Sequence, residues 1–167
     1  MIDVTSKEVT VRTATAQAVV HVGHQITELI KDNAMKKGDV LSIAQLAGIL
    51  GAKKTSEIIP LCHNIPLTGI KVNAHLDKMK KAVIIRATIQ CEGKTGVEME
   101  ALTAVSVGAL TVYDMCKAIS HNIKITDIVL ISKTGGSKKN FKREEIIVKS
   151  YETSPIIKKE EVFLSNV

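Results

Sequence analysis

The sequence predicts an α+β fold: an antiparallel sheet with helices on one of its faces, in the element order β-α-β-β-α-β. Two observations lead to this prediction. Four segments with alternating apolar and polar residues, rich in Val, Ile and Thr, indicate strands. Helical apolar spacing occurs between the first and second of these segments and again between the third and fourth. Such a sheet leaves its second face uncovered, and the chain is rich in aliphatic residues, so we expect an oligomer.

The length and composition indicate one domain. The chain has 167 residues, of which 45% are hydrophobic and 24% charged, as in ordinary globular proteins. We predict a single catalytic domain over residues 1–150. Residues 151–167 form a C-terminal tail, for which disorder and docking on a neighbouring subunit are both open.

The first strand and its crossover occupy the N-terminal third. Residues 9–22 alternate and predict the first strand. Residues 24–33 have the apolar spacing of a short amphipathic helix. Asp39 is a good N-cap, so a second helix is predicted over 40–53, and both helices count as one crossover.

The rest of the chain supplies three strands and a long helix. Residues 70–77 and 82–92 predict two strands joined by a lysine-rich turn, and residues 122–133 predict the last strand. Between them, residues 94–120 predict a long helix that is apolar on nearly every side. The Gly- and Lys-rich residues 134–143 suit closure over an anionic ligand, although a mobile basic segment is an equal alternative.

The long helix carries charged side chains only at its two ends. Glu98 and Glu100 lie near its start, and Asp114 and Lys117 near its finish. Glu100 and Asp114 are fourteen positions apart, which corresponds to about 21 Å along a continuous helix. Their angular offset is roughly 40°, so both lie near one stripe of the helix. If both ends are catalytic, two antiparallel copies of the helix must bring them together, and we expect a site shared between subunits.

Charge and composition limit the class of function. The net charge of +6 suits a phosphate-bearing partner, although a solvated lysine surface explains it equally well. Aromatic residues make up only 2%, which disfavours nucleic acid. No apolar run reaches the length of a membrane span, and the N-terminus lacks a signal peptide's apolar core, so we expect a cytoplasmic protein. Three cysteines without C-x-x-C spacing suggest neither disulfides nor a metal site, and we expect no cofactor.

Local features alone leave several candidate residues ambiguous. Arg12 is the single cation of the first strand, and an exposed strand residue is the simpler interpretation. Lys37 lies just before a helix N-terminus, where either a phosphate or a solvated turn is plausible. His63 lies between two prolines in an apolar loop, where a packed histidine is more common than a catalytic one.

Three motifs carry a resemblance to a known family. The segments IPLCHNIPL, GKTGVEMEALTAVSVGALTVYDMCKAI and SKTGG strongly resemble cyclic pyranopterin monophosphate synthase, the MoaC family of molybdenum cofactor biosynthesis. The similarity covers roughly residues 1–145. It implies ferredoxin-like subunits in a homohexamer, a trimer of dimers with active sites at the dimer interface. It also implies the substrate 3′,8-cyclo-7,8-dihydroguanosine 5′-triphosphate, supplied by an upstream radical enzyme, and the products cyclic pyranopterin monophosphate and pyrophosphate.

The resemblance also implies roles for individual residues. Asp114 matches the catalytic acid/base of the family and Lys117 its partner. The positions that match substrate-binding segments are Leu61, Cys62, His63, Met99 and Glu100. Other pocket positions are matched by Arg12, Lys37, Lys53, Glu98 and Lys133. Asn64 departs from the proline that the family often has there, and TGGSKKN departs from the commoner SGGKSG, which leaves the role of Lys138 open.

These matches lead to a mechanistic hypothesis. Asp114, Lys117 and His63 form the proton-transfer group, because carboxylate and lysine pairs exchange protons when burial and proximity tune their pKa values. Glu98 or Glu100 holds the guanine-derived ring through its N–H donors. The triphosphate is neutralised by the cations Arg12, Lys37, Lys53 and Lys133.

Two other functions are alternatives to an enzyme of this family. One is a basic RNA-binding module, which predicts aromatic residues on the strands, and the other is a purely structural oligomer.

Overall fold

The computed structural model describes residues 1–136 and 140–144. Its strands are β1 (Thr10–His21), β2 (Leu67–Asp77), β3 (Ala82–Gly93), β4 (Lys124–Thr134) and β5 (Phe141–Lys142). Its helices are α1 (Gly23–Lys31), α2 (Val40–Lys53), α3 (Thr55–Ile58) and α4 (Glu98–Cys116). The predicted strands and long helices are all present, with ends that differ by a few residues from the predicted ones.

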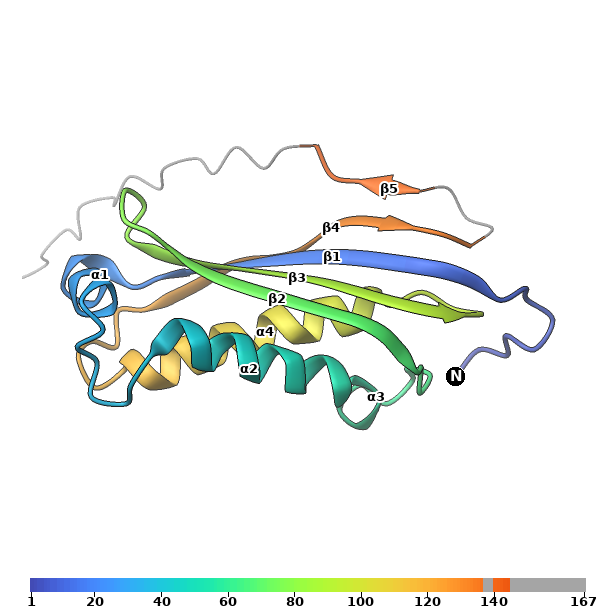
Figure 1. Cartoon of the computed structure of the whole chain (residues 1–167), viewed down its shortest axis with the longest axis horizontal. Coiled ribbons are helices and arrows are strands. Elements are labelled where there is room, and N and C mark those ends of the chain that lie inside the picture. Colours follow the sequence, from blue (N-terminus) through green and yellow to red (C-terminus); the bar gives the residue numbers. More distant parts are fainter. Residues whose placement is uncertain (137–139, 145–167) are drawn as a thin grey trace, which may run out of the picture.

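The strands form one antiparallel sheet in the order β2-β3-β1-β4-β5. The first four strands of this order give the predicted ferredoxin-like arrangement, because β1 lies between β3 and β4 rather than beside β2. The helices α2 and α4 lie side by side under one face of the sheet, while α1 lies at one end (Figure 1). The predicted α+β class and one-sided helical layer are therefore confirmed.

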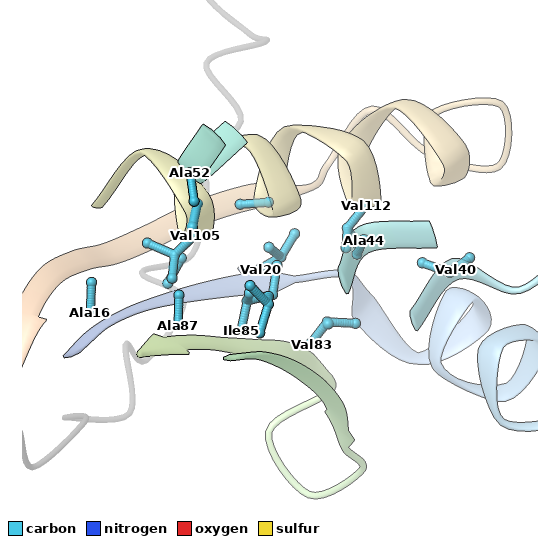
Figure 2. Close-up of a cluster of buried hydrophobic side chains, with 14 of the residues drawn as sticks. Ala16, Val20, Val40, Ala44, Ala52, Val83, Ile85, Ala87, Val105 and Val112 are labelled. Carbon is cyan, nitrogen blue, oxygen red and sulfur yellow. The ribbon is translucent and has the colours of Figure 1, made fainter. Parts of the chain in front are cut away.

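The core lies between the sheet and this helical layer. Alternate residues of β1 point toward the helices and are small: Ala14, Ala16, Ala18 and Val20, each no more than 1% exposed. Figure 2 shows sheet residues such as Ile85 facing Val105 and Val112 of α4. Small residues in both layers let the helices lie close to the strands, which fixes the direction of α4 relative to the sheet.

Glycine allows α2 and α4 to pack closely against each other. A Cβ atom on Gly51 of α2 would lie 2.9 Å from Cγ2 of Val107 and 3.3 Å from the backbone oxygen of Thr103. Any side chain there would push the helices apart, and overpacking of this kind costs about 1–3 kcal/mol. The backbones of α2 and α4 therefore come close together at this glycine.

Two short elements were not predicted. The helix α3 has four residues and β5 has two, too few for a periodic pattern. β5 pairs with β4 through Lys133 and Phe141, so the end of the Gly- and Lys-rich segment is a strand. Lys138 and the predicted tail lie outside the described residues, and the 1–150 domain limits stay a prediction.

Candidate active site

The predicted site residues divide into two groups at opposite ends of α4. This helix is continuous from Glu98 to Cys116, so fourteen positions correspond to about 21 Å along its axis. At its C-terminal end lie Lys37, Asp114 and Lys117, which we call the Asp114 cluster. The other predicted residues lie around its N-terminal end: Arg12, Lys53, Leu61, Cys62, His63, Glu98, Met99, Glu100 and Lys133.

The Asp114 cluster is a carboxylate held between two ammonium groups. Lys117 Nζ lies 2.7 Å from Oδ1 of Asp114, one helical turn away. Lys37, in the connection between α1 and α2, donates from Nζ to Oδ2 at 2.6 Å and to the Asp114 backbone oxygen at 3.1 Å. The structure thus joins Lys37 to the predicted Asp114–Lys117 pair across 77 positions of the sequence.

This arrangement favours the charged forms of the cluster. Hydrogen bonds from Lys117 and Lys37 lower the pKa of Asp114 to about 2. The hydrogen bond to Asp114 raises the pKa of Lys117. About half of each side chain is exposed in a single chain. Taken alone, therefore, the cluster is an ionised surface network and is poorly tuned for proton exchange near neutral pH.

The N-terminal end of α4 borders three adjoining hollows, which together we call the α4 groove. The cationic hollow is lined by Lys7, Arg12, Lys94 and Lys133 together with Glu98. The central hollow is lined by Leu61, Cys62, His63, Met99 and Glu100, and shares Lys7 and Glu98 with the cationic one. The third hollow contains Lys53 and Asn64, and shares Glu100 with the central one. Cations thus occupy both ends of the groove, and carboxylates and apolar side chains lie between them.

Backbone and side-chain contacts fix the cationic hollow. Lys133 Nζ of β4 donates to Glu98 Oε1 at 2.7 Å, and Arg12 Nε of β1 donates to the Gly93 oxygen at 2.8 Å. Burial opposes the ionisation of Glu98, yet the hydrogen bond from Lys133 and its charge lower the pKa of Glu98 below its ordinary value. Gly136 approaches the Arg12 guanidinium so closely that a Cβ atom there would collide with it.

Glu100 is the most unusual group in the groove. Its residue is 4% exposed, and Oε2 is buried without a hydrogen-bond partner among the described residues. Burial, and to a smaller degree the nearby charge of Glu98, raise the pKa of Glu100. A buried carboxyl group with a free oxygen can accept hydrogen bonds from a ligand or exchange a proton with it.

The loop after α3 supplies the other side of the central hollow. Leu61 is 71% exposed, and burial raises the pKa of the Cys62 thiol. His63 Nε2 lies 2.8 Å from the backbone oxygen of Ile2, so this nitrogen carries a proton and donates it. His63 therefore lies at the opposite end of α4 from Asp114, and one chain alone cannot form the hypothesised proton-transfer group.

Comparison with known proteins decides the family. Residues 1–136 match the MoaC family. This chain belongs to the MoaC family. It is 61% identical over 145 residues to "Molybdenum cofactor biosynthesis protein 1" of Drosophila melanogaster, with 87% of the chain and 26% of that protein covered. It is 51% identical over 146 residues to "Cyclic pyranopterin monophosphate synthase" of Peptoclostridium acidaminophilum, with 87% and 92% covered.

The relatives differ in length while the MoaC-family part is shared. A mitochondrial "Cyclic pyranopterin monophosphate synthase" of Arabidopsis thaliana is 53% identical over 143 residues, which cover 86% of this chain and 53% of that protein. The chain therefore spans about a quarter of the Drosophila protein, half of the Arabidopsis protein and nearly all of the bacterial one. The family resemblance seen in the sequence motifs is confirmed.

Four residues that line the α4 groove were missed by reasoning from the sequence. Lys7 and Lys94 line the cationic hollow, and Ile2 and Val4 line the central one, although none of them was predicted. They lie in irregular segments, where periodicity gives no information. The positive charge of the two lysines was the only available signal.

Within the described residues, no group of three or more His, Cys, Asp or Glu side chains could hold a metal ion. Among the helices that the structure describes, none is long and apolar enough to cross a membrane.

Proposed function

We propose that this chain is a cyclic pyranopterin monophosphate synthase of molybdenum cofactor biosynthesis. It converts 3′,8-cyclo-7,8-dihydroguanosine 5′-triphosphate into cyclic pyranopterin monophosphate and pyrophosphate. Its relatives of 48–53% identity that bear this enzyme's name support the activity. The same proposal includes a homohexamer built as a trimer of dimers, and an upstream radical enzyme that supplies the substrate.

The proposal of a shared site rests on the distance between two charged groups at opposite ends of α4. The Asp114 cluster and the α4 groove lie at opposite ends of one rigid helix, about 21 Å apart. Groups that act on one bond must lie within a few ångströms of it. A two-fold axis that pairs α4 with its copy in antiparallel orientation places the Asp114 cluster of one chain against the groove of the other.

The exposed side of the helical layer suits such a pairing. Ile43, Leu46 and Leu50 of α2 are 42%, 58% and 60% exposed, and their spacing places them on one side of the helix. Leu110 of α4 is 62% exposed and lies one turn before Asp114, on the same stripe. Exposed aliphatic residues grouped in this way mark an interface between proteins. We assign this surface to the second copy.

The groove accounts for the parts of the substrate. Arg12, Lys53 and Lys133 neutralise the triphosphate, since lysine and arginine bind phosphate through charge-assisted hydrogen bonds. Glu98 and Glu100 accept hydrogen bonds from the N–H groups of the guanine-derived ring. Leu61, Cys62 and Met99 cover the ring with apolar and sulfur-containing side chains.

The second copy also explains how the Asp114 cluster becomes reactive. Covering the cluster removes water from it, and loss of solvation raises a carboxylate pKa and lowers a lysine pKa. The pKa values of Asp114 and Lys117 then move toward each other, which makes proton transfer to and from the substrate feasible. His63 of the other chain and Lys37 complete the group, with Lys37 balancing the charge on Asp114 and on the phosphates.

The RNA-binding alternative has less support. It requires several aromatic residues on the sheet for base stacking, and Phe141 of the two-residue strand β5 is the single one on the described strands. No observation in the described part of the chain favours a purely structural role.

Subunit mixing tests the proposed site. Variants Glu100→Gln and Asp114→Asn are each expected to be inactive, and random exchange of their subunits should restore about one quarter of the wild-type rate, because half the dimers are hybrids and each hybrid has one intact site. Wild-type protein mixed with itself after the same treatment is the control. No recovery despite verified exchange contradicts a shared site.

A further inference from the structure

The N-terminal segment, residues 2–7, forms a wall of the α4 groove. Ile2, Val4 and Lys7 line the central hollow together with Leu61 and Met99. Lys7 also lines the cationic hollow, which contains Arg12 and Lys133. Lys7 therefore stands where the two hollows meet. In Figure 1 the N-terminus lies at the end of the molecule near α3, away from α1.

Hydrogen bonds fix the path of this segment. His63 Nε2 donates to the Ile2 oxygen at 2.8 Å, and Lys94 Nζ donates to the Thr5 oxygen at 2.6 Å. Asp3 Oδ1 accepts from the Thr5 amide at 2.8 Å and from its hydroxyl at 2.6 Å, which closes a tight turn. The segment before β1 has neither helix nor strand, so these polar contacts, rather than a ladder, determine where Lys7 lies.

The charge on Lys7 is uncompensated. Lys133 is paired with Glu98, Lys94 donates to the Thr5 oxygen, and Arg12 donates from Nε to the Gly93 oxygen. The Lys7 ammonium group differs from these three cations, because it makes neither an ion pair nor a hydrogen bond with any residue that the structure describes. An unpaired ammonium group beside a guanidinium group in a hollow raises the local concentration of anions and is ready to bind one.

We propose that Lys7 is a further ligand for the phosphates of the substrate, and that Lys94 and His63 are positioning residues that hold residues 2–7 in place for it. That these phosphates belong to the cyclic nucleotide substrate rests on the proposed function. Binding of phosphate anions by Lys7 does not depend on it, because inorganic pyrophosphate or tripolyphosphate presents the same oxygens to the cationic hollow.

The affinity for inorganic phosphates tests the role of Lys7. Calorimetric titration of the full chain with tripolyphosphate should show a dissociation constant about tenfold higher for Lys7→Met than for wild type, as expected for one charge-assisted contact. Lys7→Arg should keep most of the affinity. Lys78→Met, in the turn between β2 and β3 and outside the three hollows, is the matched control and should bind as wild type. A Lys7→Met affinity within twofold of wild type overturns the proposal.

A double variant tests the positioning role of Lys94. If Lys94 acts by placing Lys7, then Lys94→Met should weaken tripolyphosphate binding, and adding Lys94→Met to Lys7→Met should cause little further loss. Lys94→Arg, which can still donate to the Thr5 oxygen, should bind as wild type. If the two losses multiply, Lys94 contacts the anion itself and the positioning assignment is wrong. His63→Gln and His63→Ala extend the test, with the same non-additivity expected.

Turnover separates this inference from the proposed function. With the cyclic nucleotide substrate, Lys7→Met should raise KM about tenfold and change kcat little, because the contact is made before the chemical step. A wild-type chain that binds tripolyphosphate through Lys7 but makes no pterin refutes the proposed function and leaves the anion site standing. A chain that makes pterin with an unchanged KM in Lys7→Met refutes only the inference.

Discussion

Glu98 and Glu100, two positions apart in the first turn of α4, have pKa values shifted in opposite directions. Burial opposes the ionisation of Glu98, but the hydrogen bond and charge of Lys133, a backbone hydrogen bond and the charge of Arg12 together lower its pKa. Burial without a partner for Oε2 raises the pKa of Glu100. Neighbouring carboxyl groups whose environments separate their pKa values are suited to different roles. Glu98 is a fixed anion that orients Lys133, and Glu100 is the group able to carry a proton into the central hollow.

Replacing Glu100 should change the pH dependence of stability in a defined direction. A carboxyl group whose pKa is raised on folding binds its proton more tightly in the folded chain, so it destabilises the protein as pH rises above 4.5, its ordinary pKa. Glu100→Gln removes this destabilisation. Relative to the wild type, its free energy of unfolding should be about 1–3 kcal/mol more favourable near neutral pH than at pH 4. Urea unfolding at the two pH values and at fixed protein concentration measures it.

The exposed Glu57, which lies outside the α4 groove, provides the control for that experiment. Glu57→Gln should leave the difference between the two pH values as in the wild type. If Glu100→Gln gains no stability near neutral pH relative to acid, the carboxyl group is not destabilised by burial and its assigned role in the groove is wrong.

Removing the partner of Glu98 should have the opposite pH signature. The lowered pKa of Glu98 stabilises the folded chain above its ordinary pKa of 4.5, and this stability is lost as pH falls through the lower folded value. Lys133→Met should therefore reduce stability near neutral pH by about 1–2 kcal/mol and flatten the acid side of the profile. Lys71→Met, on β2, is the control for removing a lysine from the sheet. An unchanged acid profile in Lys133→Met contradicts the pairing.

The elements of the fold could be predicted because each depends on local pattern. Asp39 was recognised as an N-cap from its place before an apolar repeat, and its side chain does accept from the Ser42 amide at 3.0 Å. The groove could be predicted only in part, because its contacts join distant positions: Lys37 with Asp114, 77 positions away, and Lys133 with Glu98, 35 away. Sheet register and helix packing create these pairs, and a single sequence does not encode them in any local spacing.

Gly136 should be needed for the position of Arg12. Its φ angle is +80°, and a Cβ atom would collide with the Arg12 guanidinium, so Gly136→Ala displaces that group from the cationic hollow. We expect KM to rise about tenfold, with a smaller effect on kcat. Gly23→Ala is the matched control: its φ is +77° with nothing within 4 Å of the new Cβ.

Both alanine variants should lose about 1–2 kcal/mol of stability from the left-handed backbone alone. Thermal unfolding of the two variants measures this loss of stability, which both should share. Equal KM values in the two variants contradict the assignment of Arg12 to phosphate binding.

Asp114→Asn should separate catalysis from assembly. The neutral amide keeps the shape of the side chain and one acceptor oxygen for Lys37 or Lys117, but it cannot take up a proton. Light scattering should show an unchanged oligomer, and pterin formation should fall by at least about 100-fold, the lower end of what general acid–base catalysis contributes. Asp77→Asn is the control, because it removes the ion pair with Lys80 on the distant β2–β3 hairpin. Turnover at the wild-type rate in Asp114→Asn removes this residue from the mechanism.

The exposed aliphatic stripe on α2 should control assembly and activity together. Leu50 is 60% exposed in the single chain and lies on the side of α2 assigned to the second copy. Leu50→Lys places a charge in that interface and removes about 1.5–3 kcal/mol of apolar burial per chain, an effect felt twice across a two-fold axis. The variant should dissociate in light scattering and lose pterin formation in parallel, while the circular dichroism of the chain stays native. Met79 lies in the turn between β2 and β3 and is 92% exposed, so Met79→Lys should affect neither property. A folded, monomeric Leu50→Lys that still turns over at the wild-type rate means that one chain suffices for catalysis.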